Sequence, residues 1–172
     1  MTAHDEIIGC VRLDDIDDLA AKAAGLEKRV QLVLLAPAVR ENLFAKMLDA
    51  AGDMIERCRI ITMTDELERA DAVLGHDKGY IYPSSLLYLV SGMFEEMNAE
   101  AYPDAPILGM QRFSSMSSLN TAEQDAAKSI ATFFQKEGHG IIVSPTPGIA
   151  MANSHGDFDD EPLTLATARA LF

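Results

Sequence analysis

The sequence predicts an α/β fold in which helices cover both faces of a parallel sheet. Short apolar runs alternate along the chain with longer segments of helical period. Strict alternation of this kind implies parallel strands joined by crossover helices. The run Val30–Ala36 is also apolar at nearly every position, which is typical of a strand covered on both faces.

Five segments are predicted to be strands: Val30–Ala36, Cys58–Met63, Asp71–Gly75, Pro106–Met110 and Gly140–Ser144. The predicted helices are Val39–Ala51, Thr64–Leu67, Pro83–Met97, Thr121–Lys136 and Leu163–Leu171. Residues 1–28 form an N-terminal extension with one predicted helix, because an apolar stripe follows four aspartates that favour a helix start. The length of 172 residues favours a single domain over residues 1–172.

Composition and charge exclude several classes of partner. The formal net charge of −13 argues against nucleic acid, because phosphate backbones are bound mainly through clustered Lys and Arg. No apolar run approaches the ~20 residues that cross a bilayer, and the first residues lack the pattern of a secretory signal. We therefore expect a cytoplasmic protein without membrane association. Cys10 and Cys58 lack metal-ligand spacing, so no metal site is predicted.

The loops that follow the predicted strands share one edge of the sheet. Two of them, Gln111–Asn120 and Pro145–Pro162, exceed the usual two to six or so residues of such connections. The last loop also gathers Gly, Asp and Pro residues around His155. Because ligands bind at the carboxyl edge of open α/β sheets, we expect a site there.

Three segments carry a family resemblance. Gly75–Tyr82, followed by Pro83 and a helix, is similar to an aromatic and glycine loop, and Gln111–Ser118 to a loop that wraps a flavin ring. Lys136–Val143 and the closing stretch Gly156–Arg169 are similar to a last strand and C-terminal segment. Together they resemble the flavodoxin-like fold, in particular the tryptophan-repressor-binding-protein type of FMN-dependent NAD(P)H:quinone oxidoreductase.

The resemblance implies a three-layer α/β/α fold with five parallel strands in the order 2-1-3-4-5, in a homo-oligomer. It implies FMN as cofactor, NAD(P)H as electron donor and a quinone-like acceptor as substrates. Arg40 and Asn42 would bind the phosphate, Tyr80, Tyr82 and Pro83 one edge of the flavin, and His155 would be the catalytic residue on the acceptor side. The other edge of the flavin would be contacted by Gln111, Arg112, Phe113, Ser114 and Ser115.

The loop after the first strand departs from the family pattern. That family binds the FMN phosphate with a turn rich in Ser, Thr, Gly and Asn, whereas Ala36–Asn42 offers no hydroxyl and no glycine. Pro37 also removes one backbone donor. An alternative is therefore a flavodoxin-like domain that has lost flavin binding and acts as a binding or assembly module.

A third hypothesis comes from the turn Gly75-His76-Asp77-Lys78-Gly79. Gly-x-Asp-x-Gly is the form that a nucleophile elbow takes when aspartate replaces serine. With His155 downstream, and Asp157 or Asp159 to orient it, this pattern is that of a hydrolase that forms an aspartyl ester.

Overall fold

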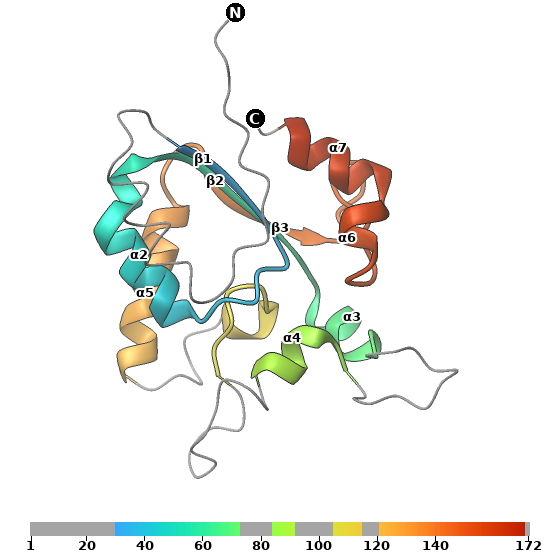
Figure 1. Ribbon diagram of the computed structural model, residues 1–172, viewed down its shortest axis with the longest axis horizontal. Helices are drawn as coiled ribbons and strands as arrows, with labels where there is room; N and C mark the ends of the chain where they lie inside the picture. Colours follow the sequence, from blue (N-terminus) through green and yellow to red (C-terminus); the bar gives the residue numbers. More distant parts are fainter. Residues whose placement is uncertain (1–29, 73–83, 92–104, 115–120, 171–172) are drawn as a thin grey trace, which may run out of the picture.

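The computed structural model describes residues 30–72, 84–91, 105–114 and 121–170 (Figure 1). The described residues form a three-stranded parallel sheet of β1 (Val30–Leu35), β2 (Ile55–Met63) and β3 (His139–Ser144). β2 lies in the middle, so the order is β1-β2-β3. The predicted α/β class with parallel strands is confirmed for this part of the chain.

The strand order predicted from the resemblance is wrong for these three strands. The order 2-1-3-4-5 places the first strand between the second and third, whereas β2 pairs with both β1 and the predicted fifth strand, β3. β2 is the longest of the three, and its Ile60, Ile61 and Met63 are 0% exposed. β1 is only half-buried along its whole length despite its more apolar sequence. The middle position therefore belongs to the strand that buries residues on both faces.

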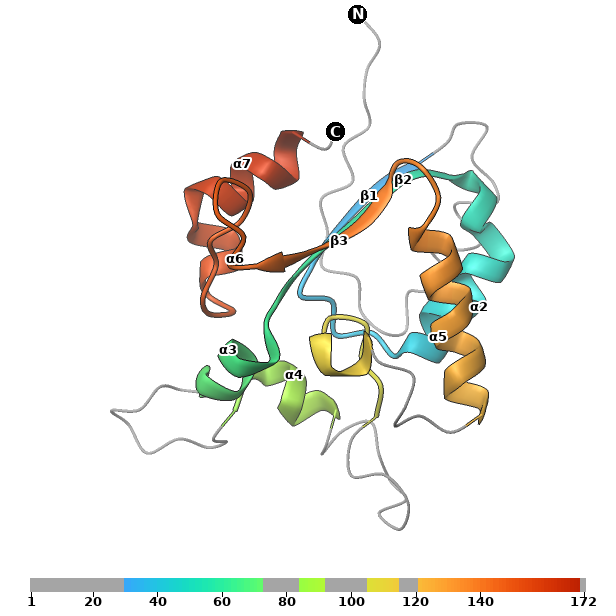
Figure 2. The same cartoon turned by 180° about the vertical axis from the view of Figure 1, so that it is seen from behind.

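Helices cover both faces of the sheet, as Figures 1 and 2 show from opposite sides. α2 (Glu41–Ala51) and α5 (Thr121–Phe134) lie on one face, and α6 (Asp157–Asp160) and α7 (Pro162–Ala170) on the other. α3 (Asp65–Ala70) directly follows β2, and α4 (Leu86–Leu89) lies beside it at the carboxyl end of the sheet. Two short 3-10 helices, η2 (Gly52–Met54) and η5 (Gln111–Ser114), complete the described elements. None of the described helices is long and apolar enough to cross a membrane.

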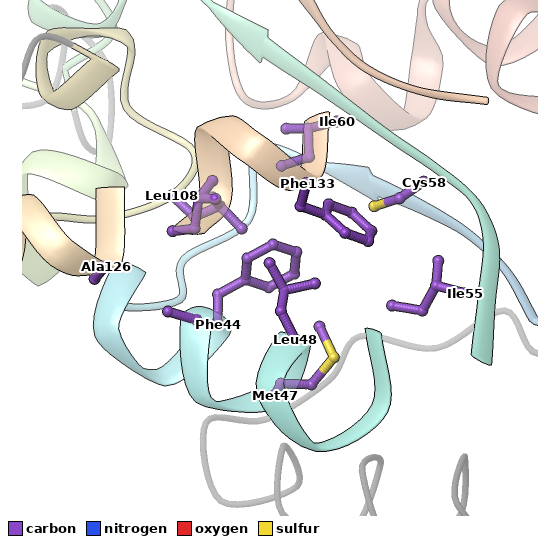
Figure 3. Packing of buried hydrophobic residues seen from close by; sticks show 11 residues of the cluster. Phe44, Met47, Leu48, Ile55, Cys58, Ile60, Leu108, Ala126 and Phe133 are labelled. Carbon is purple, nitrogen blue, oxygen red and sulfur yellow. The ribbon is translucent and has the colours of Figure 1, made fainter. Parts of the chain in front are cut away.

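Alternate residues of β2 supply the two halves of the core. Cys58 and Ile60 face α2 and α5, where Phe44 and Phe133 pack edge to face with ring centroids 6.5 Å apart (Figure 3). On the opposite face Ile61 and Met63 pack with the following buried residues of the C-terminal segment: Ala150, Ala152, Phe158 and Ala168. The period of two along the strand thus assigns consecutive side chains to different helical layers.

The helices predicted from local patterns are present, with shifted ends. The predictions Val39–Ala51, Thr64–Leu67, Thr121–Lys136 and Leu163–Leu171 correspond to α2, α3, α5 and α7. Thr64 precedes α3 as its N-cap and accepts a hydrogen bond from the Leu67 N–H at 3.4 Å. α4 lies within the predicted helix Pro83–Met97, whose later residues lie outside the described ranges. α6 was not predicted.

The predicted strand Pro106–Met110 is not a strand. Its residues are buried, but they make only two isolated bridges, from Ile107 to Arg40 and from Met110 to Met63. Gly109 donates its N–H to the Pro37 carbonyl at 3.0 Å, and a Cβ at Gly109 would lie 2.7 Å from that oxygen. The segment therefore packs against the loop that follows β1, and this burial explains its apolar sequence.

Two other predicted elements lie largely outside the described residues. Asp71 and Ala72 begin the predicted third strand and are not in a strand, and the rest of that segment lies outside the described ranges. The N-terminal extension, residues 1–28, also lies outside them. Both remain predictions.

Candidate functional site

Polar side chains from three segments meet at the carboxyl end of the sheet. β2 leads through Thr64 into α3, and the Thr64 N–H donates to the Ser144 carbonyl at the end of β3 at 3.1 Å. Four residues in this region form what we call the acid–histidine cluster. They are Glu68 on α3, Asp71 just after it, Ser85 before α4, and His155 in the loop after β3.

Asp71 holds His155 through two hydrogen-bond contacts. Its Oδ2 lies 3.0 Å from the imidazole Nδ1 and accepts the backbone N–H of His155 at 2.8 Å. Both side chains are 23% exposed. A carboxylate at Nδ1 fixes the orientation of the ring and places the proton of a neutral imidazole on Nδ1. Nε2 is then free to accept a proton.

Glu68 faces the other side of the same imidazole. Its side chain is 1% exposed, and its Oε2 lies 3.9 Å from His155 Nε2. The Ser85 hydroxyl donates to that Oε2, while the Ser85 N–H donates to the Glu68 carbonyl at 2.8 Å. Burial raises the pKa of Glu68; the Ser85 hydrogen bond and the charge of His155 lower it, and Asp71 and Asp65 raise it further.

Two buried atoms of the acid–histidine cluster lack a hydrogen-bond partner among the residues that the structure describes. They are Glu68 Oε1 and His155 Nε2. Buried polar atoms are rarely left unpaired, so each such atom is a position where a ligand or water could bind. Here the two atoms belong to neighbouring groups that can both exchange protons.

A second set of polar contacts joins α3 to α4 and η5. The Tyr88 hydroxyl donates to Asp65 Oδ1 at 2.5 Å, and Arg69 Nε donates to the same hydroxyl at 3.1 Å. Gln111 Oε1 accepts the Asp65 N–H at 2.9 Å, and the Arg112 guanidinium lies 5.2 Å from the centre of the Tyr88 ring. η5 therefore lies at the same edge as α3.

The structure brings together only some of the predicted site residues. Gln111 and Arg112 lie in η5 with Phe113, whose ring is 5.1 Å from the Arg112 guanidinium, and Ser114 ends that element. Arg40 and Asn42 lie at the start of α2, where Asn42 is exposed. Tyr80, Tyr82, Pro83 and Ser115 fall outside the described residues.

His155 has a different orienting group from the two that the hydrolase hypothesis proposed. Asp157 accepts the N–H groups of Asn153 and Ser154 at 2.9 and 3.1 Å, so it shapes the turn before α6. Asp159 is exposed on α6. Neither takes the position beside Nδ1, which Asp71 occupies. The assignment of Asp157 or Asp159 to this role is wrong.

The N-terminus of α2 does not fit the phosphate of FMN. The Glu41 N–H donates to the Pro106 carbonyl at 3.0 Å, and those of Leu43 and Phe44 to the Arg40 carbonyl at 3.1 Å. The Glu41 carboxyl is buried there, and burial, then the charge of Glu123, raises its pKa to about 7. A phosphate at this helix end needs free N–H donors, and a buried acidic side chain opposes it. FMN binding stays a prediction without support from these residues.

The sequence pattern points to His155 as a candidate but not to Asp71 and Glu68, the residues that lie beside it in the structure. The sequence pattern places Asp71 in a strand. Glu68 is one of several charged residues in the six-residue helix α3, and no residue near it in the sequence sets it apart from the others. Asp71 and His155 are 84 positions apart, so no local spacing could reveal the contact. The described residues contain no group of three or more His, Cys, Asp or Glu that could hold a metal ion.

The fold and the site thus define an α/β protein with a buried acid–histidine cluster at the carboxyl edge of its sheet. Comparison with known proteins adds no relative, because no family model, no curated protein and no solved structure matches this chain.

Proposed function

We propose that the chain is an enzyme that transfers protons at the acid–histidine cluster, a hydrolase with His155 as general acid and base. The observation that carries the proposal is the position of this imidazole. Asp71 lies 3.0 Å from Nδ1, and Nε2 has no partner and faces Glu68. A histidine oriented by a carboxylate at one nitrogen, with the other nitrogen available, is the arrangement that general base catalysis requires.

The two carboxyl groups would have different roles. Asp71 keeps the proton of the neutral ring on Nδ1 and stabilises the imidazolium that forms when Nε2 takes a proton. Glu68 is buried, and a raised pKa lets its carboxyl group hold a proton and return it. At 3.9 Å, Glu68 Oε2 and Nε2 are too far apart for a direct hydrogen bond, but such distances often shorten when substrate binds.

The atoms without partners support water as the reacting molecule. A water that donates one hydrogen to Nε2 and the other to Glu68 Oε1 would satisfy both acceptors. Its oxygen would attack the acyl carbon while Nε2 takes the proton, and the imidazolium would return that proton to the alcohol or amine as its bond to the acyl carbon breaks. Because the chain carries a net charge of −13, an uncharged or cationic ester or amide is favoured over an anionic substrate.

Hydrolysis of the neutral ester p-nitrophenyl acetate tests the proposal. We expect His155→Gln to lower kcat/KM by about 10²–10⁴-fold, the usual contribution of a general base. His139→Gln is the matched control, because His139 stacks on Phe133 in the core with ring centroids 4.2 Å apart. Equal rates for the two variants, or no turnover by the unaltered protein above the buffer rate, would contradict the proposal.

A fluorescence titration with FMN tests the competing expectation in the same samples. Quenching at micromolar protein would support the oxidoreductase, and an unchanged signal would support a flavin-free domain. NAD(P)H, a quinone-like acceptor, a homo-oligomer and a cytoplasmic location stay predictions from the sequence.

A further inference from the structure

The acid–histidine cluster also joins segments that are distant in the chain. Glu68 and Asp71 come from α3 and its end, Ser85 precedes α4, and His155 lies in the loop after β3. Ser85 reaches Glu68 through both its hydroxyl and its backbone N–H, and His155 reaches Asp71 through both its ring and its backbone N–H. Ser85 and His155 are therefore each attached to α3 or its end through the carboxyl group of a titratable residue, Glu68 for Ser85 and Asp71 for His155.

We propose that ionisation of the buried Glu68 carboxyl weakens the attachment of the loop before α6 and of the start of α4 to α3, so that both open as pH rises. The proposal rests on the geometry of the cluster and is independent of any catalytic role.

The groups that face Glu68 explain the direction of the switch. Within the cluster only the Ser85 hydroxyl donates a hydrogen bond to its carboxyl, and His155 offers a positive charge only while its ring is protonated. Asp65 and Asp71 face the same carboxyl with negative charge. Of the groups on the neighbouring elements, Arg69 and the Tyr88 hydroxyl contact Asp65 and each other. The Arg112 guanidinium lies over the Tyr88 ring.

Raising the pH therefore destabilises the closed arrangement, because Glu68 loses its proton. At low pH the Glu68 carboxyl is neutral. At high pH it is a buried carboxylate that faces the negative charges of Asp65 and Asp71, and an uncompensated buried charge is costly. Opening the loop gives the carboxylate access to water.

The sign of the effect follows from the burial of Glu68. Burial raises its pKa in the folded state above the ordinary value of 4.5. Its contribution to stability is thus fully present below pH 4.5, falls as pH rises toward the raised pKa, and is constant above it. One proton gives a change of up to about tenfold per pH unit in the opening equilibrium over that interval.

Amide hydrogen exchange measured by NMR between pH 4.5 and 9 tests the proposal. The reporters are the hydrogen-bonded amides of Ser85, His155, Asp157 and Phe158. After correction for intrinsic exchange, we expect their protection to fall by up to about tenfold per pH unit and then level off. Amides of β2 report global opening and serve as the internal reference. Glu68→Gln should abolish the decrease at the reporter amides.

Two further variants keep the test decisive. Glu41→Gln is the matched control, because it removes another buried carboxyl and should leave the decrease at the reporter amides unchanged. Ser85→Ala removes a hydrogen bond that lowers the pKa of Glu68, so the decrease should extend to higher pH. The proposal is overturned if the decrease persists in Glu68→Gln, or, should that variant not fold, if Ser85→Ala leaves the pH range unchanged.

Discussion

Glu41 and Glu68 are two buried glutamates in different surroundings. Glu41 begins α2, its Oε2 has no partner, and Glu123 on α5 adds a second negative charge. Glu68 accepts a hydrogen bond from Ser85 and faces an imidazole that Asp71 orients. Burial raises the pKa of both carboxyl groups, so an altered pKa alone does not identify a site. The Glu68 region differs because a neighbouring side chain, His155, can exchange protons. Glu41 instead occupies the N-terminus of α2, the position where a bound anion would lie.

The largest expected effect concerns the orientation of His155. Asp71→Asn should lower kcat/KM for ester hydrolysis by about 10²–10⁴-fold, because an amide does not hold the imidazole in the tautomer that leaves Nε2 free. Asp157→Asn is the matched control, since Asp157 binds backbone amides in the same loop and does not contact the ring. A loss of activity in the control equal to that in Asp71→Asn would show that loop structure alone is responsible.

The next effect concerns the stability of the Glu41 region. A pKa raised from 4.5 to about 7 costs the folded state about 3 kcal/mol above pH 7, at about 1.4 kcal/mol per pH unit. Glu41→Gln should therefore raise the free energy of unfolding at pH 8 by about 1–3 kcal/mol, and the difference should vanish below pH 4.5. Urea unfolding at pH 4, 6 and 8 measures this. A difference that does not change with pH would contradict the account.

The packing beside the start of α2 can be tested at Gly109. A Cβ there would lie 2.7 Å from the Pro37 carbonyl oxygen, so Gly109→Ala must shift backbone and should lower the free energy of unfolding by about 1–3 kcal/mol. Gly52→Ala is the control, because a Cβ there would lie 3.7 Å from Leu48, at ordinary contact distance. Equal losses of stability in urea for the two variants would contradict the tight approach.

The smallest effect has the opposite pH dependence. Glu161 accepts hydrogen bonds from the Thr164 hydroxyl and from the N–H groups of Leu163, Thr164 and Met151, which lower its pKa to about 2. Its contribution to stability is present above pH 4.5 and is lost as pH falls toward 2. Glu161→Gln should thus lower Tm at pH 7 and lose this effect near pH 2. A lower Tm at both pH values would instead indicate lost packing.

Local sequence patterns predicted the elements of the fold better than their arrangement. β1, β2, β3, α2 and α5 follow from hydrophobic periodicity, which acts within a few positions. The strand order came from a family resemblance, and the paired strands do not follow it. Pro106–Met110 has the apolar sequence of a strand, but its burial results from contact with Pro37 and Arg40, which a local pattern cannot show.

The candidate site was predictable in the same limited way. The position of His155 in a loop at the carboxyl edge is a local property of the sequence, and the structure places it at that edge. Its contacts with Asp71 and Glu68 are long-range contacts, so they depend on how α3 packs against the loop after β3. Asp157 is close to His155 in sequence, which makes it a candidate partner, but its carboxylate accepts hydrogen bonds from backbone N–H groups.

The tautomer of His155 tests the central claim most directly. We predict from ¹⁵N NMR that, where the ring is neutral, the proton lies on Nδ1 and Nε2 is unprotonated, because Asp71 Oδ2 lies 3.0 Å from Nδ1. In Asp71→Asn this preference should weaken. A neutral ring that carries its proton on Nε2 in the unaltered protein would contradict the account, since Nε2 could not then act as a base.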